Sequence, residues 1–266
     1  LLHEEAGRAA RAMGDYESSL QYFEQWLALA RESNNARWTR DAQHQQSVTL
    51  FEMGELDRSN EIIRSLLSID PLPDSQRLRF RHSQANLQLR RGQYEQAFEN
   101  YLDLANQEKL IGPAFAGDCF CSAAICSQRL GMIAKARQQI AEGAAAYRRA
   151  NAVFGEVIAL NNLGNFQESA GEFSAARNTY EQALERAQKC AYLHGLSALH
   201  ANLSYSCYLF EEPDNAERHA AIALERARQI RHRNSEIIAL INLALALERS
   251  GLLSEAEVRI SESIEL

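Results

Sequence analysis

Apolar residues recur along the chain with the spacing of helices. Before Gly171 they stand three or four residues apart, at Leu160, Leu163 and Phe166. After Gly171 a second such segment follows, with apolar residues at Phe173, Ala176, Tyr180, Ala183 and Leu184. Because glycine takes the left-handed conformation that ends a helix without steric cost, the pattern predicts two helices joined by a turn at Gly171.

This helix-turn-helix pattern repeats about every 40 residues. Six glycines in similar phrases are separated by 40, 38, 39, 40 and 80 residues: Gly14, Gly54, Gly92, Gly131, Gly171 and Gly251. The gap of 80 residues spans two periods, and the segment from Glu211 to Asp214 occupies the expected turn. The spacing predicts fourteen antiparallel helices in one superhelical domain over residues 1–266, with turns at the glycines and at Glu212. The seven repeats are expected at 1–36, 37–74, 75–113, 114–152, 153–192, 193–232 and 233–266.

A small residue follows each turn by five positions. These small residues are Ser19, Ser59, Ala97, Ala136, Ala176, Ala216 and Ala256. A small side chain there lets the two helices of a pair approach closely, and an aromatic residue one turn later fills the gap between repeats. Each helix alone has too narrow an apolar stripe to be stable, so the sequence predicts that the repeats stack into an all-α solenoid.

The repeat resembles the tetratricopeptide repeat. Its best copy is Asn162-Leu163-Gly164 followed by Gly171, Ala176, Tyr180 and Ala183. The resemblance extends over nearly the whole chain and implies a right-handed α-solenoid. The period near 40 residues is longer than the usual repeat of about 34. A longer repeat with Asn-Leu in its first helix is similar to those of kinesin light chains, of Pins-type adaptors and of the sensor domains of MalT-type regulators.

The resemblance also implies that the first helix of each pair lines a binding groove. Nine residues before each turn stands a polar side chain, in order Glu5, Gln45, Ser83, Ser122, Asn162, Asn202 and Asn242. Asparagine is a poor helix former, and its amide can bond both groups of a peptide backbone. Related repeats use such asparagines to bind a partner, which implies this role for the asparagine ladder (Asn162, Asn202, Asn242) and for Asn165, with Asn86 and Asn161 on the same face. The alternative is that the asparagines tie neighbouring repeats together.

Charged and aromatic residues extend the expected binding groove toward both ends. His44 and His82 occupy equivalent places in adjacent repeats, with Arg79 and Arg90 on the same predicted face. They predict a cluster that binds a partner or senses pH, and solvated surface residues are the alternative. Toward the C-terminus the face becomes more apolar, or these positions belong to the core: Tyr205, Tyr208, Ile238, Ile241 and Leu245.

Composition and charge narrow the classes of function. The chain has 266 residues with a formal net charge of −7, which argues against binding to nucleic acid phosphates. The pattern contains no apolar run long enough to span a membrane and no signal peptide. Five cysteines, an odd number within helical patterns, indicate reduced thiols in a cytoplasmic protein: Cys119, Cys121, Cys126, Cys190 and Cys207. Because Leu1 already lies in a helical pattern, the chain is expected to be part of a longer protein.

We expect no enzyme activity and no cofactor, because no phosphate-binding loop, nucleophile elbow or HExxH helix is present. The spacing of Cys119 and Cys121 points the two thiols to different sides of a helix, which argues against a metal site. The sequence therefore favours a protein-interaction scaffold that binds an extended or helical segment of another protein, or alternatively other domains of the same full-length chain. Two alternatives remain: an effector-sensing domain of a signalling ATPase or transcription regulator, and an architectural or self-association solenoid.

Overall fold

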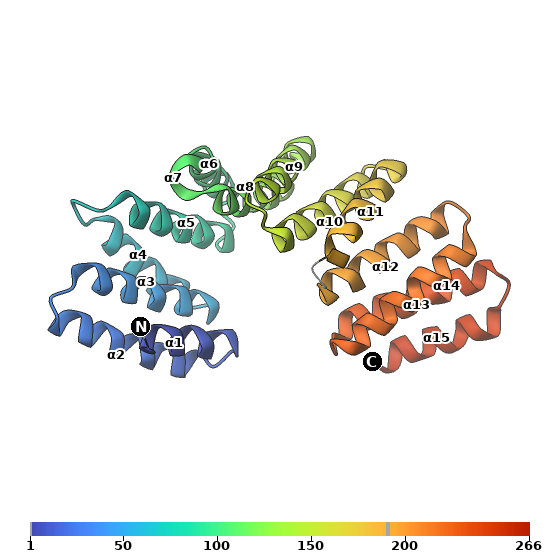
Figure 1. The fold of residues 1–266 in the computed structure, drawn as a ribbon, viewed down its shortest axis with the longest axis horizontal. Coiled ribbons are helices and arrows are strands. Elements are labelled where there is room, and N and C mark those ends of the chain that lie inside the picture. Colours follow the sequence, from blue (N-terminus) through green and yellow to red (C-terminus); the bar gives the residue numbers. More distant parts are fainter. Residues whose placement is uncertain (1, 190–191) are drawn as a thin grey trace. The chain divides into compact units, whose positions relative to one another are not determined.

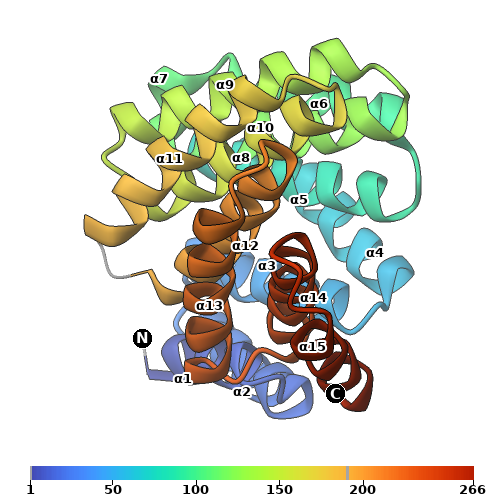
Figure 2. The ribbon, with the colours of Figure 1, turned by 90° about the vertical axis from the view of Figure 1, so that its right-hand side faces the viewer.

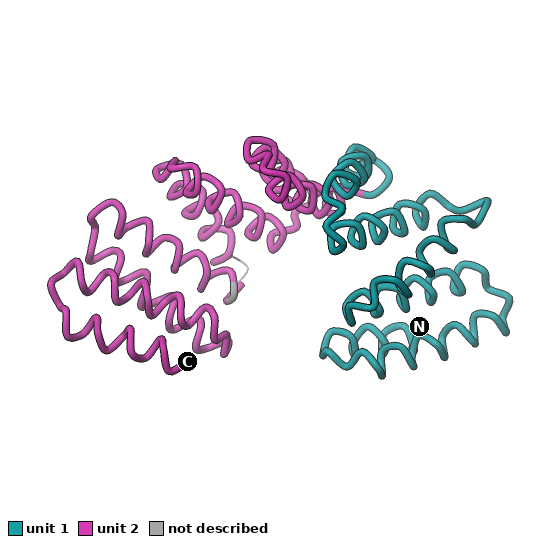
Figure 3. Tube along the Cα trace, turned by 180° about the vertical axis from the view of Figure 1, so that it is seen from behind, with its two compact units in different colours: residues 1–111 teal, residues 112–266 magenta. Residues whose placement is uncertain are grey.

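The computed structural model describes residues 2–189 and 192–266, and these residues form fifteen helices (Figure 1). The helices fall into two compact units, unit 1 over Leu1–Ile111 and unit 2 over Gly112–Leu266 (Figure 3). Unit 1 contains α1 (Leu2–Ala12), α2 (Tyr16–Glu32), α3 (Ala36–Glu52), α4 (Leu56–Leu67), α5 (Asp74–Arg90), α6 (Tyr94–Ala105) and α7 (Glu108–Ile111). Unit 2 contains α8 (Pro113–Arg129), α9 (Ile133–Arg149), α10 (Val153–Ser169), α11 (Phe173–Lys189), α12 (Leu193–Leu209), α13 (Pro213–Gln229), α14 (Arg233–Arg249) and α15 (Leu253–Glu265).

The helices form seven antiparallel pairs, as the repeat predicts, and α7 is an additional four-residue helix between the third and fourth pairs. The glycines at the predicted turns have positive φ, for example 76° at Gly171. Where the glycine is missing, Glu211 takes the left-handed conformation with φ 62°, and Glu212 is the N-cap of α13. The sixth turn is thus centred one residue before the predicted position. The organisation as one continuous domain remains a prediction.

The small residues after the turns lie between the helices of each pair. Ala97, Ala136 and Ala216 are fully buried, and Ala176 is nearly so. In the second pair serine replaces alanine, and Oγ of Ser59 donates to the carbonyl oxygen of Ser47 in the facing helix at 2.8 Å. The expected close approach at these positions is confirmed.

The aromatic residues one turn later are also buried. Tyr101 and Tyr180 are fully buried, as is Phe23 in the first pair. The Tyr180 ring packs on Gly164 so closely that a Cβ added to this glycine would lie 2.3 Å from a ring carbon. Glycine at this position of α10 therefore makes room for the tyrosine.

In unit 2 the first helix of each pair contacts the first helix of the next pair. α8 contacts α10, α10 contacts α12, and α12 contacts α14, while the second helices pack on the first helices of the next pair. α13, α14 and α15 follow one another in this way (Figure 2). We call the surface formed by α8, α10, α12 and α14 the inner face of unit 2, and that formed by α1, α3 and α5 the inner face of unit 1.

Candidate partner-binding face

Two members of the asparagine ladder bond the preceding repeat. Nδ2 of Asn202 donates to Oδ1 of Asn161 at 2.9 Å and to Oδ1 of Asn165 at 3.2 Å. Nδ2 of Asn242 donates to the backbone carbonyl oxygen of Ala201 at 2.8 Å. These bonds join α10 to α12 and α12 to α14, so the amides of Asn202 and Asn242 are already engaged within the protein.

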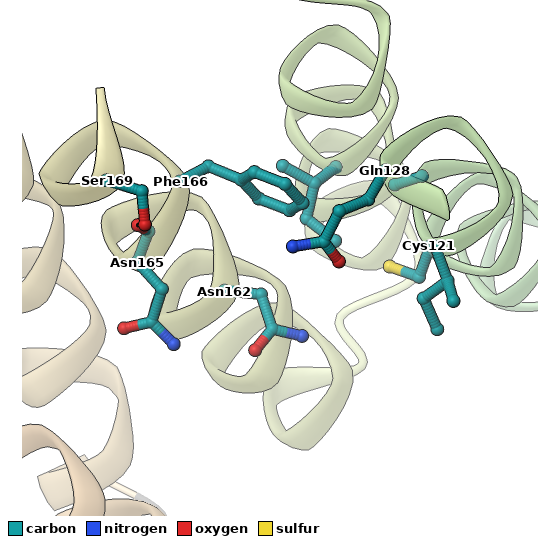
Figure 4. A pocket seen from close by; sticks show the side chains of 9 residues that line it. Cys121, Gln128, Asn162, Asn165, Phe166 and Ser169 are labelled. Atoms are coloured by element: carbon teal, nitrogen blue, oxygen red, sulfur yellow. The ribbon is translucent and has the colours of Figure 1, made fainter. Parts of the chain in front are cut away.

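Asn162, the remaining member of the ladder, bonds none of the described residues through its side chain. The residue one repeat earlier that corresponds to Asn161 and Ala201 is Cys121, whose side chain offers no amide oxygen. The Asn162 amide instead borders a pocket between α8 and α10 (Figure 4). The three asparagines therefore share one repeat position, but two of them bond the preceding repeat and the third borders a pocket.

The pocket between α8 and α10 has a volume of about 220 Å³. Nine residues line it: Cys121, Ala124, Ile125, Gln128, Ile140, Asn162, Asn165, Phe166 and Ser169. The amides of Gln128 and Asn162 face the space between the two helices from opposite sides, and the Phe166 ring lies beside them (Figure 4). Its lining carries amides, a hydroxyl and apolar groups but no charged side chain, which suits an uncharged guest group.

Asn165 and Asn86 each accept a hydrogen bond from a tyrosine of their own repeat. The Tyr180 hydroxyl donates to Oδ1 of Asn165 at 2.8 Å, and the Tyr101 hydroxyl donates to Oδ1 of Asn86. In both pairs the tyrosine follows the asparagine by fifteen residues. The sequence contains this spacing, and it would have identified both bonds as satisfying the hydroxyl of a buried tyrosine.

His44 is buried in unit 1, with 7% of its surface exposed, so it is not a solvated surface residue. Its Nε2 lies 2.8 Å from Oγ of Ser83, and its ring packs on Phe80 with centroids 5.0 Å apart. Burial, reinforced by the Arg79 charge, lowers the pKa of His44 to about 4. The ring of His82 meets that of Tyr101 edge-on at 5.8 Å, so the two histidines contact different aromatic residues.

The arginines predicted for the binding groove also make contacts between repeats. Nη2 of Arg79 lies 2.7 Å from Oδ1 of Asp41, and Nε2 of Gln76 donates to the same oxygen at 2.9 Å. The guanidinium of Arg90 lies over the Phe51 ring, 5.2 Å from its centroid. These contacts join α5 to α3, and the role of both arginines in partner binding stays a prediction.

Apolar side chains are exposed at the C-terminal end of the inner face of unit 2. Ile238 is 51% exposed, and Ile241 and Tyr205 are exposed as well, so these three are not core residues. Tyr205 stacks on Tyr208 with ring centroids 6.3 Å apart. Further along, a pocket of about 510 Å³ between α14 and α15 includes the carboxylates of Glu248 and Glu257.

The cysteines among the described residues are reduced and at least partly buried. Cys119, Cys121, Cys126 and Cys207 carry free thiols. Burial raises the pKa of Cys119 and of Cys121 to about 12, so both thiols stay protonated. Within residues 2–189 and 192–266, no three His, Cys, Asp or Glu side chains lie close enough together to hold a metal ion. Cys190 lies outside the described residues.

Sequence reasoning used Phe166 only as evidence of helical periodicity and gave Gln128 no role, yet both residues line the pocket between α8 and α10. Their positions in the repeat are not those of the asparagine ladder, and no short motif marks them. Only the packing of α8 beside α10 brings them together with Asn162.

Comparisons with known proteins agree with the helix pairs. The family model of the tetratricopeptide repeat matches residues 2–37 and 159–191. A search of curated protein sequences finds no match. Among solved structures, the apo form of RapI has a TM-score of 0.79 at 12% identity, over 98% of this chain and 74% of RapI.

Two further solved structures share the fold. The apo form of the quorum sensor NprR from B. thuringiensis has a TM-score of 0.67 at 13% identity, over 99% of this chain and 74% of NprR. The kinesin light chain repeats of Podosopora anserina reach 0.57 at 15% identity, over 73% of this chain and 96% of theirs. The chain thus shares the all-α fold of these tetratricopeptide-like helical solenoids, and the family model itself matches two of its segments. No helix among the described residues has the length and apolar character that a membrane crossing requires.

Proposed function

We propose that the chain is a protein-interaction module without enzyme activity, and that it binds a segment of a partner protein on the inner face of unit 2. One observation carries this proposal: the amide of Asn162 lacks a partner within the described residues and borders an uncharged pocket between two first helices. Exposed apolar residues on α10 and α14, among them Ile158 and Ile238, support it. Repeat proteins of this fold commonly present such extended surfaces to partners.

The experiment is a selection from a library of random twelve-residue peptides displayed on phage, with the whole chain as bait. Enriched peptides are then synthesised, and their affinity is measured by fluorescence anisotropy. We expect binding that Asn162→Ala weakens about two- to tenfold, the range of one lost hydrogen bond. Asn242→Ala is the matched control, because it removes an amide at the same repeat position that is bonded to Ala201.

No enrichment over a bait-free control would contradict the proposal and favour the architectural solenoid, which self-association measured by analytical ultracentrifugation would then support. A second candidate is an effector-sensing domain of a larger regulator in the cytoplasm. This candidate is supported by the similarity in fold, over 99% of this chain, to a protein described as a quorum sensor. It predicts that the selected peptides compete with a soluble effector at the same face.

A further inference from the structure

We propose that the pocket between α8 and α10 selects the partner: it takes one uncharged apolar side chain from an extended segment, whose backbone bonds Asn162 and Gln128. This inference rests on the proposed function and narrows it from a face to one pocket and one class of segment. Three features of the pocket carry it, namely its position, its size and lining, and its two amides.

The pocket lies where the asparagine of the ladder has no hydrogen-bond partner on the preceding first helix among the described residues. Between α10 and α12 the Asn202 amide bonds Asn161 and Asn165 across the gap. Between α12 and α14 the Asn242 amide bonds the Ala201 carbonyl. Between α8 and α10 the corresponding bond is absent among the described residues, and the pocket lies there instead. At the same repeat position, Asn202 and Asn242 thus join neighbouring repeats, whereas the Asn162 amide bonds none of the described residues.

Size and lining determine the guest side chain. A dry cavity of about 150 Å³ already holds benzene, so about 220 Å³ accepts a side chain as large as leucine, methionine or phenylalanine. Ala124 and Ile140 are buried beneath the pocket, and Phe166 is half-buried beside it. A Lys, Arg, Asp or Glu side chain would lose its hydration there without meeting an opposite charge.

The two amides determine the conformation of the guest. The side-chain amides of Asn162 and Gln128 each offer donors and an acceptor, and neither is used by the described residues. In a helical guest the backbone N–H and C=O groups bond one another, so only an extended segment has them free. Of the extended and the helical partner segments that the sequence leaves open, the pocket therefore fits the extended one.

The test uses the tightest peptide from the display selection and the whole chain. Ser169→Trp, at an exposed residue on the pocket rim, fills the space and should weaken binding more than about tenfold. Ser174→Trp, at an exposed serine of α11 outside the pocket, is the matched control and should bind as the unaltered chain does. Circular dichroism melts of both variants exclude unfolding as the cause of a loss.

Changes in the peptide test the chemistry. Replacing its apolar anchor by Lys or by Asp should each weaken binding more than about tenfold. Methylating the anchor's backbone nitrogen should weaken it about two- to tenfold, and the loss should shrink in Asn162→Ala or Gln128→Ala. If Ser169→Trp binds normally, or if charged anchors bind equally well, this inference is overturned while the proposed function stands. If no peptide binds the unaltered chain, the proposed function fails first.

Discussion

The inner faces of the two units use the same scaffold with different chemistry. In unit 1 the first helices are joined by charged groups: Arg11 donates to Gln45, and Arg79 pairs with Asp41. In unit 2 they are joined by amides, and α12 carries no charged residue at all. The small and aromatic residues that pack each pair recur in both units. The repeat thus fixes the packing between helices and leaves the exposed first-helix positions free to differ.

The two units also differ in the charge of the residues that line their pockets. A pocket of about 470 Å³ in unit 1 is rimmed by Arg31 and Arg40, of which Arg40 donates to Gln76 at 2.7 Å. The pocket between α8 and α10 of unit 2 has no charged lining residue and two amides that bond none of the described residues. Comparing like substitutions in the two units tests whether this contrast is functional or only compositional.

Acid should have the largest effect, and on both units. Burial lowers the pKa of His44 in unit 1 and of His200 in unit 2 to about 4, whereas an unfolded histidine titrates near 6.5. Between these values the unfolded chain binds more protons, so the free energy of unfolding falls as the pH decreases from 6.5 toward 4. We expect each histidine to contribute about 1–3 kcal/mol of this loss.

Urea unfolding at pH 7.0 and pH 4.5 measures the effect of acid. His44→Gln and His200→Gln should each make the free energy of unfolding less dependent on pH, because the neutral amide does not titrate. A pH dependence that neither substitution changes would show that the carboxylates, and not these histidines, cause the acid sensitivity.

Overpacking should destabilise each unit by a similar amount. Ala97→Leu in unit 1 and Ala176→Leu in unit 2 place three extra heavy atoms between two helices at buried alanines. Each should lower the free energy of unfolding by about 1–3 kcal/mol. Ala141→Leu, at an exposed position of α9, is the control and should have little effect. Calorimetry of all three also tests the predicted single domain, since one shared transition supports it and two separate transitions contradict it.

Loss of a ladder amide should affect stability unequally. Asn242→Ala leaves the Ala201 carbonyl without its side-chain donor and should cost about 0.5–1.5 kcal/mol of unfolding free energy. Asn162→Ala removes no such bond, and alanine is the better helix former, so stability should stay the same or rise slightly. Thermal melts of both variants give the comparison. Equal losses would mean that Asn162 is also a tie between repeats.

The smallest effects are expected for ion pairs between repeats. Arg79→Ala breaks the pair with Asp41, whose side chain is 15% exposed, and Arg137→Ala breaks the pair with Glu172, which is 42% exposed. Both should cost about 1 kcal/mol or less, with the larger loss for Arg79. Repeating the urea titrations in 1 M NaCl should reduce the loss for Arg137 more, because salt screens exposed charges more strongly. A larger loss for Arg137→Ala than for Arg79→Ala would show that the ion pair in unit 2 contributes more to stability.

Periodicity made the fold predictable from sequence. The turns, the small residues and the buried aromatics recur about every 40 residues, and each is explained by contacts inside one helix pair. Even the turn without glycine followed from spacing, although its left-handed residue is Glu211 and not Glu212. α7 has no counterpart in the other repeats, so periodicity contained no sign of it.

The candidate site was predictable only as a set of positions. The sequence placed Asn162, Asn202 and Asn242 on one face, and that follows from a helical register alone. Which of them is engaged depends on the residue opposite, about 40 positions earlier in the chain: Cys121 for Asn162, Asn161 and Asn165 for Asn202, and the Ala201 backbone for Asn242. Likewise, His44 is buried because α5 brings Phe80 and Ser83 against it. Local pattern fixed which residues share a face, whereas bonds and burial across repeats depend on helix packing, which only the tertiary structure decided.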